Sequence, residues 1–237
     1  MIIEFVGIPG SGKTYISNKL NHYLKGNFPN QKVVHNKDLF HKIKKNGKLK
    51  AIKNLIPILF KLSFYKMLFH ILIGKASYKQ KKQLIIIFLI RLLMYKEIEK
   101  KQSQDYIFVL DEGFSHFSIS YFRQQKIIPN QGDFNQFFAK IDILLNYHSF
   151  YKYYIFIDSH VDKNYQRIEK RSKGWPQGTK EFSYDNKIKY LNKNLEVYQA
   201  VKTFITRKEK NLIIDNTTFI RTYDGYFNEV FHGEFNL

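Results

Sequence analysis

The sequence predicts an α/β protein in which a five-stranded parallel sheet is covered by helices on both faces. Five short apolar runs are separated by segments with helical periodicity, as expected of parallel strands joined by crossover helices. A glycine-rich loop follows the first run, and an acidic residue closes the third and the fourth. In open α/β sheets, ligands bind at the carboxyl ends of the strands. The predicted strands span residues 2–6, 32–35, 106–110, 153–157 and 211–215.

The segments between these runs indicate helices. Apolar residues at helical spacing predict a helix over residues 15–24, and the break at 27–30 contains Pro29. Residues 38–104 are predicted to be mostly helical. Further helical patterns cover residues 117–125, 133–145 and 184–208, and a basic helix with a loop occupies residues 163–179. We expect one domain, 1–237, with a helical insertion at about 39–104 and a lid at about 163–180.

The chain of 237 residues contains no cysteine, which excludes disulfides, thiolate metal sites and cysteine nucleophiles. It begins without the pattern of a secretory signal. We therefore expect a cytoplasmic protein.

Its net charge is +19, of which +14 lies between His41 and Lys101. Such a segment attracts anionic partners, although an AT-rich coding sequence would also enrich lysine. Two apolar stretches, 55–73 and 84–94, are too short or too charged to span a bilayer. They are either core helices or basic amphipathic helices in peripheral contact with an anionic membrane, while nucleic acid is a less favoured partner.

The loop between the first strand and the first helix has the Walker A pattern G-x4-G-K-T. Its glycines let backbone N–H groups surround phosphate oxygens at a helix N-terminus. Lys13 is predicted to reach the β- and γ-phosphates of ATP, and the Thr14 hydroxyl to hold Mg²⁺. The nucleotide-binding residues predicted in this loop are Gly7, Pro9, Gly10, Ser11, Gly12, Lys13 and Thr14.

Asp111 ends an apolar strand, the position of a Walker B aspartate, and is the second predicted metal partner. Glu112, next to it, is a candidate base, substrate ligand or surface residue. The histidines His35, His41 and His116 lack metal-ligand spacing, so a zinc site is not expected.

Two arginines after the fourth strand, Arg167 and Arg171, are one helical turn apart beside a glycine-containing loop. They suit a lid that closes on the transferring phosphates. Trp175 lies in this lid, where loop packing is the commoner role and stacking on a ligand the alternative. The guanine motif Asn-Lys-x-Asp is absent, which favours ATP over GTP.

The order of these motifs resembles that of the P-loop nucleoside and nucleotide kinase superfamily, which includes thymidylate kinases and small-molecule kinases. The resemblance covers most of the chain and implies a three-layer P-loop kinase fold. It implies that the nucleotide base rests against the loop after the fifth strand, Asp215, Asn216 and Thr217. It further implies an acceptor-binding acid after the second strand, for which Asp38 matches best, with Asn36 as a second ligand. An arginine that commonly follows the Walker B acid is replaced by Glu112-Gly113, a departure from members that phosphorylate nucleosides or dTMP.

We therefore expect a kinase that transfers the γ-phosphate of ATP to the hydroxyl or phosphate of a small, anionic acceptor, including a glycan or membrane-associated precursor. The predicted catalytic residues are Lys13, Asp38, Asp111, Glu112, Arg167 and Arg171. Two alternatives remain: a nucleoside monophosphate kinase, and a P-loop ATPase or regulatory module that binds nucleic acid or membrane through the basic insertion.

Overall fold

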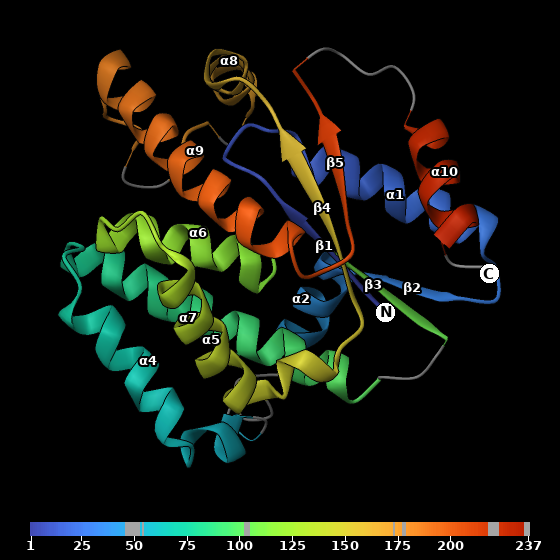
Figure 1. Cartoon of the computed structure of the whole chain (residues 1–237), viewed down its shortest axis with the longest axis horizontal. Coiled ribbons are helices and arrows are strands. Elements are labelled where there is room, and N and C mark those ends of the chain that lie inside the picture. The colour runs from blue at the N-terminus through green and yellow to red at the C-terminus, as the bar shows by residue number, and fades with distance from the viewer. Residues whose placement is uncertain are drawn as a thin grey trace.

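The fold is built on a parallel five-stranded sheet in the order β2-β3-β1-β4-β5 (Figure 1). The computed structural model describes residues 1–45, 53, 55–101, 105–172, 174–176, 179–217 and 223–234. The strands are β1 (Ile2–Val6), β2 (Lys32–His35), β3 (Tyr106–Leu110), β4 (Lys152–Asp158) and β5 (Asn211–Asp215). The prediction of five parallel strands is confirmed, and only β4 is longer than predicted.

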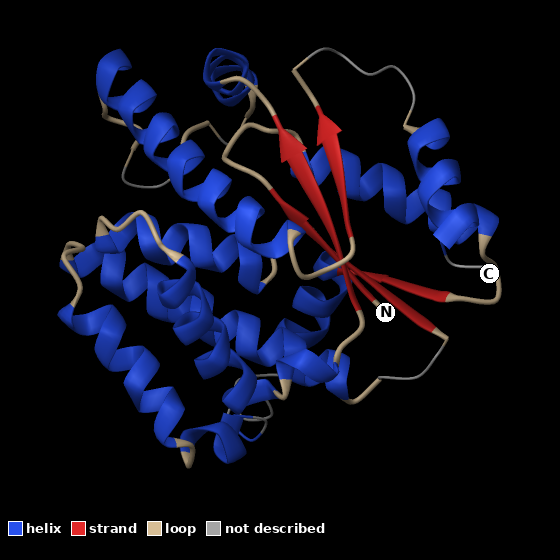
Figure 2. Ribbon diagram, viewed as in Figure 1, coloured by secondary structure: helices blue, strands red, loops and turns tan. Residues whose placement is uncertain are grey.

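Helices lie on both sides of the sheet, which makes three layers (Figure 2). Along β1, side chains alternate between two cores: Ile3 and Phe5 pack on one side, and Ile2 and Val6 on the other. The first side is covered by α1 (Lys13–Asn27) and α10 (Asp224–Glu234), which contact each other. Helix α10 was not predicted, because its sequence has a weak apolar period.

The larger helical layer covers the opposite face of the sheet (Figure 1). It contains α2 (Asn36–Lys45), α4 (Leu62–Ile73), α5 (Tyr78–Glu99), α6 (Phe114–Gln125), α7 (Gln131–Leu145) and α9 (Tyr184–Thr206). A short 3-10 turn, Tyr147–Ser149, precedes β4, and α8 (Val161–Lys170) follows it. Parts of the predicted insertion (46–52, 54 and 102–104) and of the predicted lid (173, 177 and 178) lie outside the described residues.

Helix α5 begins at a capping box that also turns the chain back after α4. Ser77 Oγ accepts a hydrogen bond from Gln80 N at 3.4 Å, and Gln80 Oε1 accepts one from Ser77 N at 3.0 Å. The reciprocal bonds satisfy backbone donors at the first turn. Helix α4 packs against α5 and α7 and forms the outer layer of this side of the molecule.

A buried carboxylate links the sheet to the start of α6. Glu4 on β1 is fully buried and accepts hydrogen bonds from Ser115 N at 2.6 Å, Tyr147 Oη at 3.1 Å and Tyr95 Oη at 3.2 Å. Desolvation raises the pKa of Glu4 above its ordinary value, although these hydrogen bonds oppose the shift. A Cβ atom at Gly113 would lie 2.2 Å from the Glu4 carboxylate carbon, so only glycine fits this close approach. The contact fixes the turn that follows β3.

Candidate active site

The glycine loop after β1 takes the backbone form that phosphate binding requires. Gly10 and Gly12 have φ angles of +84° and +97°, a region that side chains with a Cβ rarely adopt. Helix α1 begins at Lys13, so its free N–H groups and the positive end of its dipole face the loop. This geometry forms an anion-binding site at the carboxyl end of β1.

Lys13 folds over the loop that it follows. Its Nζ donates hydrogen bonds to the carbonyl oxygens of Gly7 at 2.7 Å and Ile8 at 3.0 Å. Desolvation lowers the pKa of Lys13 to about 8, although the nearby carboxylates of Glu112 and Asp111 act in the opposite direction. The ammonium group is thus held in a buried position beside two acids.

Asp111, directly after β3, is buried and contacts both α1 and α2. Thr14 Oγ1 donates a hydrogen bond to one Asp111 carboxylate oxygen at 3.1 Å, and Asn36 Nδ2 donates to the other. A hydroxyl and a carboxylate are hard oxygen ligands, and they fit Mg²⁺. The part of the chain that the structure describes contains no group of three His, Asp or Glu side chains that could hold a metal ion by itself.

The two candidate bases lie in different surroundings. Asp38 is exposed, accepts a hydrogen bond from His35 N at 3.2 Å, and does not line the cavity described below. Glu112 does line the cavity, and its carboxylate forms an ion pair with Arg91 at 2.5 Å. Desolvation acts to raise the pKa of Glu112, but the neighbouring cations outweigh it and leave the pKa below its ordinary value. Glu112 is therefore ionised at neutral pH.

Arg91, on α5, was not singled out from the sequence as a site residue. Only 3% of its surface is exposed, and its Nε atom has no hydrogen-bond partner among the described residues. The sequence did contain a signal, because Arg91 interrupts the apolar run 84–94. A core helix does not carry a charge at such a position unless the charge has a partner.

Helix α6 contributes a histidine, His116, and a second arginine, Arg123, to the part of the molecule that contains Arg91 and Glu112. The Arg123 guanidinium lies 4.6 Å from the centre of the Tyr190 ring on α9, a cation–π contact. Desolvation, together with the charge of Lys13, lowers the pKa of His116 to about 3, so its ring is neutral. Arg123 forms no ion pair with a carboxylate in the described part of the chain.

Lys13, Thr14, Arg91, Glu112, His116 and Arg123 line one cavity of about 1290 Å³ that begins at the glycine loop and runs between α5, α6 and α9, whereas Asn36, Asp38 and Asp111 do not line it. Its volume exceeds that of a typical small-molecule pocket, so it can hold two ligands side by side. Polar lining residues away from the glycine loop are Ser77, Lys79, Gln80, Lys82, Gln83, Arg91, Glu112, His116, Ser120, Arg123, Gln124, Arg167, Arg171, Thr179, Glu181, Tyr190 and Asn194.

The two lid arginines both line the cavity, but on different kinds of backbone. Arg167 lies within α8, and its NH2 atom donates a hydrogen bond to Asn216 O at 2.8 Å. Arg171 follows the last residue of α8 in extended backbone, and its Nε donates to Gly174 O at 2.7 Å. Trp175 is buried against Ile168 and Leu191, so it packs within the lid.

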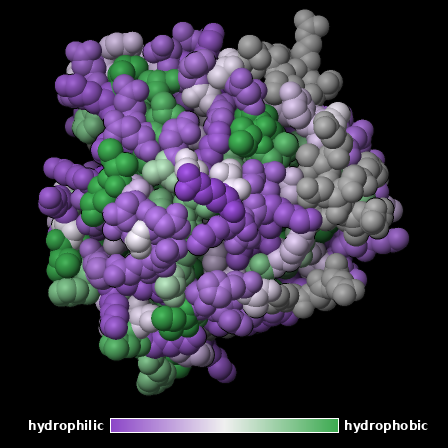
Figure 3. All heavy atoms as spheres, viewed as in Figure 1, coloured by the Kyte–Doolittle hydropathy of each residue, from purple (hydrophilic) through white to green (hydrophobic). Residues whose placement is uncertain are grey.

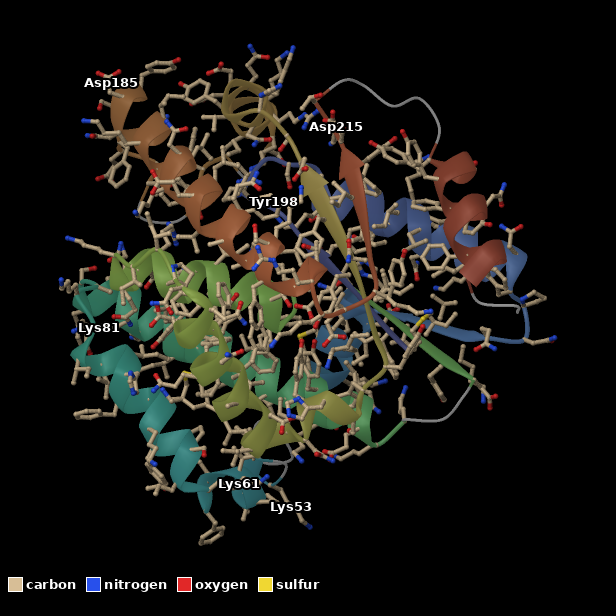
Figure 4. The ribbon with its side chains drawn as sticks, in the orientation of Figure 1. Lys53, Lys61, Lys81, Asp185, Tyr198 and Asp215 are labelled. Carbon is tan, nitrogen blue, oxygen red and sulfur yellow. The ribbon has the colours of Figure 1, made fainter. Side chains whose placement is uncertain are left out.

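The loop after β5 holds the glycine loop in place. Asn216 is buried, its Nδ2 donates to Ser11 O at 2.7 Å, and its Oδ1 accepts from Tyr223 Oη at 3.2 Å. Asp215 is exposed at the tip of β5 (Figure 4), and its carboxylate accepts from Thr217 N at 2.9 Å. Neither Asp215 nor Thr217 lines the cavity.

Comparisons with known proteins support the fold. No protein-family model matches the chain, and neither does any curated protein. Among solved structures, the deoxyadenosine kinase from M. mycoides with bound dATP matches with a TM-score of 0.50 and 15% identity, over 98% of this chain and 100% of that one. The same enzyme with bound dCTP matches over the same shares, with a TM-score of 0.50 and 16% identity. The chain is similar to these kinases in its fold. At this level of identity the similarity concerns the P-loop kinase fold alone.

Within the described residues, no helix is both long and apolar enough to cross a membrane.

Proposed function

We propose that the protein is an ATP-dependent kinase that transfers the γ-phosphate to a small anionic acceptor. One observation carries the proposal: the glycine loop and a separate polar wall, formed by Arg91, Glu112 and Arg123, face the same cavity. A kinase must hold a donor and an acceptor together, away from bulk water. A P-loop switch that only hydrolyses ATP needs no second polar wall.

The donor half of the site is the glycine loop. The N–H groups at the start of α1 and the Lys13 ammonium would bind the phosphates of ATP. Thr14 and Asp111 would hold Mg²⁺, which when bound neutralises charge on the β- and γ-phosphates. Asn36 fixes the Asp111 carboxylate by donating to its second oxygen. Arg167 and Arg171, on the lid side, would bind the charge that develops on the transferring group.

Glu112 is the group best placed to orient the acceptor. An acceptor hydroxyl would donate a hydrogen bond to Glu112, and its oxygen would form the new bond to phosphorus as the bond to the ADP oxygen breaks. The hydroxyl proton would pass to the Glu112 carboxylate or to solvent. A carboxylate with a low pKa suffices for this role, although it is a weak base. Phosphoryl transfer has a loose transition state and depends mainly on positioning and electrostatic stabilisation. Arg91 would keep Glu112 ionised and fixed in place.

The charge of the cavity favours an anionic acceptor. Among the described residues that line it, seven are Lys or Arg, whereas only Glu112 and Glu181 are acidic. Mg-ATP would offset part of this excess near the glycine loop, but Arg123 lies on the acceptor side, and its guanidinium is held over Tyr190 without a carboxylate. A phosphate monoester would complement it. Nucleoside monophosphates and sugar phosphates share this chemistry. The similar solved structures are deoxyadenosine kinases, which are named for a neutral nucleoside, so the nucleoside is tested beside its monophosphate.

The deciding experiment measures ADP release from Mg-ATP with acceptors in matched pairs: deoxyadenosine and dAMP, thymidine and dTMP, and simple sugars with their phosphates. We expect the phosphorylated member of one pair to accelerate ADP release at least a hundredfold. Lys13→Ala should abolish the acceleration, whereas Lys19→Ala, on the same helix but outside the cavity, should retain it. Acceleration by polynucleotides or anionic vesicles alone would refute the kinase.

Arg123→Gln tests the anionic acceptor separately. We expect the KM of the anionic acceptor to rise at least tenfold, in line with the loss of a charge-assisted hydrogen bond, while the KM of ATP stays within twofold. Arg207→Gln, at the exposed end of α9, is the matched control. A neutral acceptor that outperforms its phosphorylated partner would show that the site selects for something other than charge, and would leave the kinase proposal standing.

A further inference from the structure

Helix α4 has two apolar faces, of which only one is buried. Phe64, Met67 and Ile71 are buried on the side that packs against α5 and α7. On the other side, a row of large apolar side chains is exposed, which we call the α4 face. It consists of Phe60, Leu62, Tyr65, Phe69, Leu72 and Ile73. A helix with large apolar side chains on two faces is normally covered on both, and this one is covered on only one.

The exposure of the α4 face is high. Phe60 is 86% exposed, Leu62 68% and Phe69 61%. The spacing of 62, 65, 69, 72 and 73 places these side chains along one stripe of the helix. In Figure 3, apolar side chains gather along the lower left edge of the molecule, over α4. A contiguous exposed apolar stripe on a water-facing helix marks an interaction surface.

The charged residues of the segment that carries the α4 face have one sign. Lys66 is exposed on the edge of the stripe, and Lys53 and Lys75 are exposed near its two ends. Figure 4 shows Lys53 at one end of α4 and Lys81, on α5, near the other. Lys61 is not part of this set, because its Nζ donates to the carbonyl oxygens of Ile143 and Leu144 at the end of α7. No Asp or Glu occurs anywhere between residues 39 and 96.

We infer that the α4 face binds the surface of an anionic lipid bilayer. Apolar side chains flanked by lysines fit such a surface, because the side chains enter the boundary between headgroups and acyl chains while the ammonium groups contact lipid phosphates. A second copy of the chain is a poorer match, since a two-fold contact would bring the same lysines face to face with no carboxylate from this segment to neutralise them. The helix lies on the bilayer, because it is too short to cross it.

The docked helix is followed along the chain by one wall of the cavity. Ser77, Lys79 and Lys82, at the start of α5, line the cavity, and they follow α4 after a turn of a few residues. A protein docked through the α4 face would thus hold the start of α5 beside the docked helix. Binding to the bilayer requires neither ATP nor an acceptor, so it stands or falls independently of the proposed kinase activity.

The test is co-sedimentation of the full-length protein with vesicles of 30% phosphatidylserine in phosphatidylcholine, beside vesicles of phosphatidylcholine alone. We expect wild type to bind the anionic vesicles at least tenfold more tightly, and to lose most of this binding in 0.5 M NaCl. Phe69→Glu and the pair Lys66→Glu with Lys75→Glu should each weaken binding at least tenfold. Tyr226→Glu, which changes a 42% exposed aromatic residue on α10, is the matched control and should bind as wild type does. All substituted positions are exposed, and circular dichroism with thermal unfolding verifies that each variant is folded.

Light scattering of the same proteins separates the lipid surface from an interface between copies. A wild-type monomer that binds anionic vesicles supports the proposal. A wild-type dimer that Phe69→Glu dissociates, with no vesicle binding, would overturn it and assign the α4 face to a second copy. Equal binding to neutral and anionic vesicles, or binding that Phe69→Glu leaves unchanged, would overturn it as well.

Discussion

Replacing Asn216 by alanine tests the idea that the loop after β5 holds the glycine loop in its phosphate-binding shape. The substitution removes the 2.7 Å hydrogen bond to Ser11 O and the 3.2 Å hydrogen bond from Tyr223 Oη, both buried. Each buried group left without a partner costs about 1–3 kcal/mol. We therefore expect the free energy of unfolding to fall by roughly 2–6 kcal/mol, because two groups lose their partner.

The same change should weaken nucleotide binding. The Asn216 amide is the nearest neighbour of Gly12, with Nδ2 2.6 Å from where a Cβ atom would lie, so its loss frees the loop at the start of α1. Displacing binding groups by about 1 Å can reduce function a hundredfold, so we expect the affinity for Mg-ADP to fall by tenfold or more. Urea unfolding and isothermal titration with Mg-ADP measure the two effects.

Asn211→Ala is the matched control. Asn211 lies at the opposite end of β5, and its Nδ2 also donates to backbone carbonyls, those of Thr206 and Glu209, but at the partly exposed edge of the sheet. We expect a loss of about 1 kcal/mol or less in the free energy of unfolding and an unchanged affinity for Mg-ADP. If Asn216→Ala behaved like this control in both assays, the assignment of Asn216 as the support of the glycine loop would be wrong.

Three further predictions follow from the burial of charged and small residues. The pKa of Lys13 is about 8, and only its ammonium form attracts phosphate, so the affinity for Mg-ADP in isothermal titration should be roughly tenfold lower at pH 9 than at pH 7. An affinity that does not change with pH would contradict the role of Lys13 in binding phosphate. Burial raises the folded-state pKa of Glu4, so the folded protein binds the proton of this carboxyl more tightly than the unfolded chain does, and the free energy of unfolding should fall as the pH rises above 4.5. In urea unfolding, Glu4→Gln should remove this fall. If the fall persists in Glu4→Gln, another group causes it. Gly113→Ala should lower the free energy of unfolding by about 1–3 kcal/mol because the new methyl group overlaps the Glu4 carboxylate, whereas Gly225→Ala, with open space around it, should not destabilise the protein. Equal melting temperatures for the two alanine variants would contradict the close approach.

The strands and the glycine loop could be predicted from the sequence because both depend on short-range pattern. A strand in a covered parallel sheet contains an apolar run, and β1, β2, β3 and β5 have the bounds that were predicted around such runs. The glycine loop needs positive φ angles at Gly10 and Gly12, which few other residues tolerate. The placement of Asp111 at the end of β3 followed from the same local rule.

The site beyond the glycine loop could not be predicted in the same way. Asp38 follows the right strand, but the first turn of α2 directs it to the backbone of His35 and to solvent. Arg171 was expected on one helical face with Arg167, but α8 ends one residue before it. Helix periodicity fixes which residues share a face, and it does not fix where the helix stops or what lies opposite.

The sequence by itself determined the parallel sheet, the glycine loop and the strand-end aspartate, because each is encoded within a few neighbouring residues. Only the tertiary structure decided that Arg91 pairs with Glu112, that Asn216 supports Ser11, and that one face of α4 stays exposed. The first two contacts join residues 21 and 205 positions apart, and the third depends on which helices cover which. Such relations follow from the packing of helices against the sheet, which local patterns constrain too weakly to place one side chain opposite another.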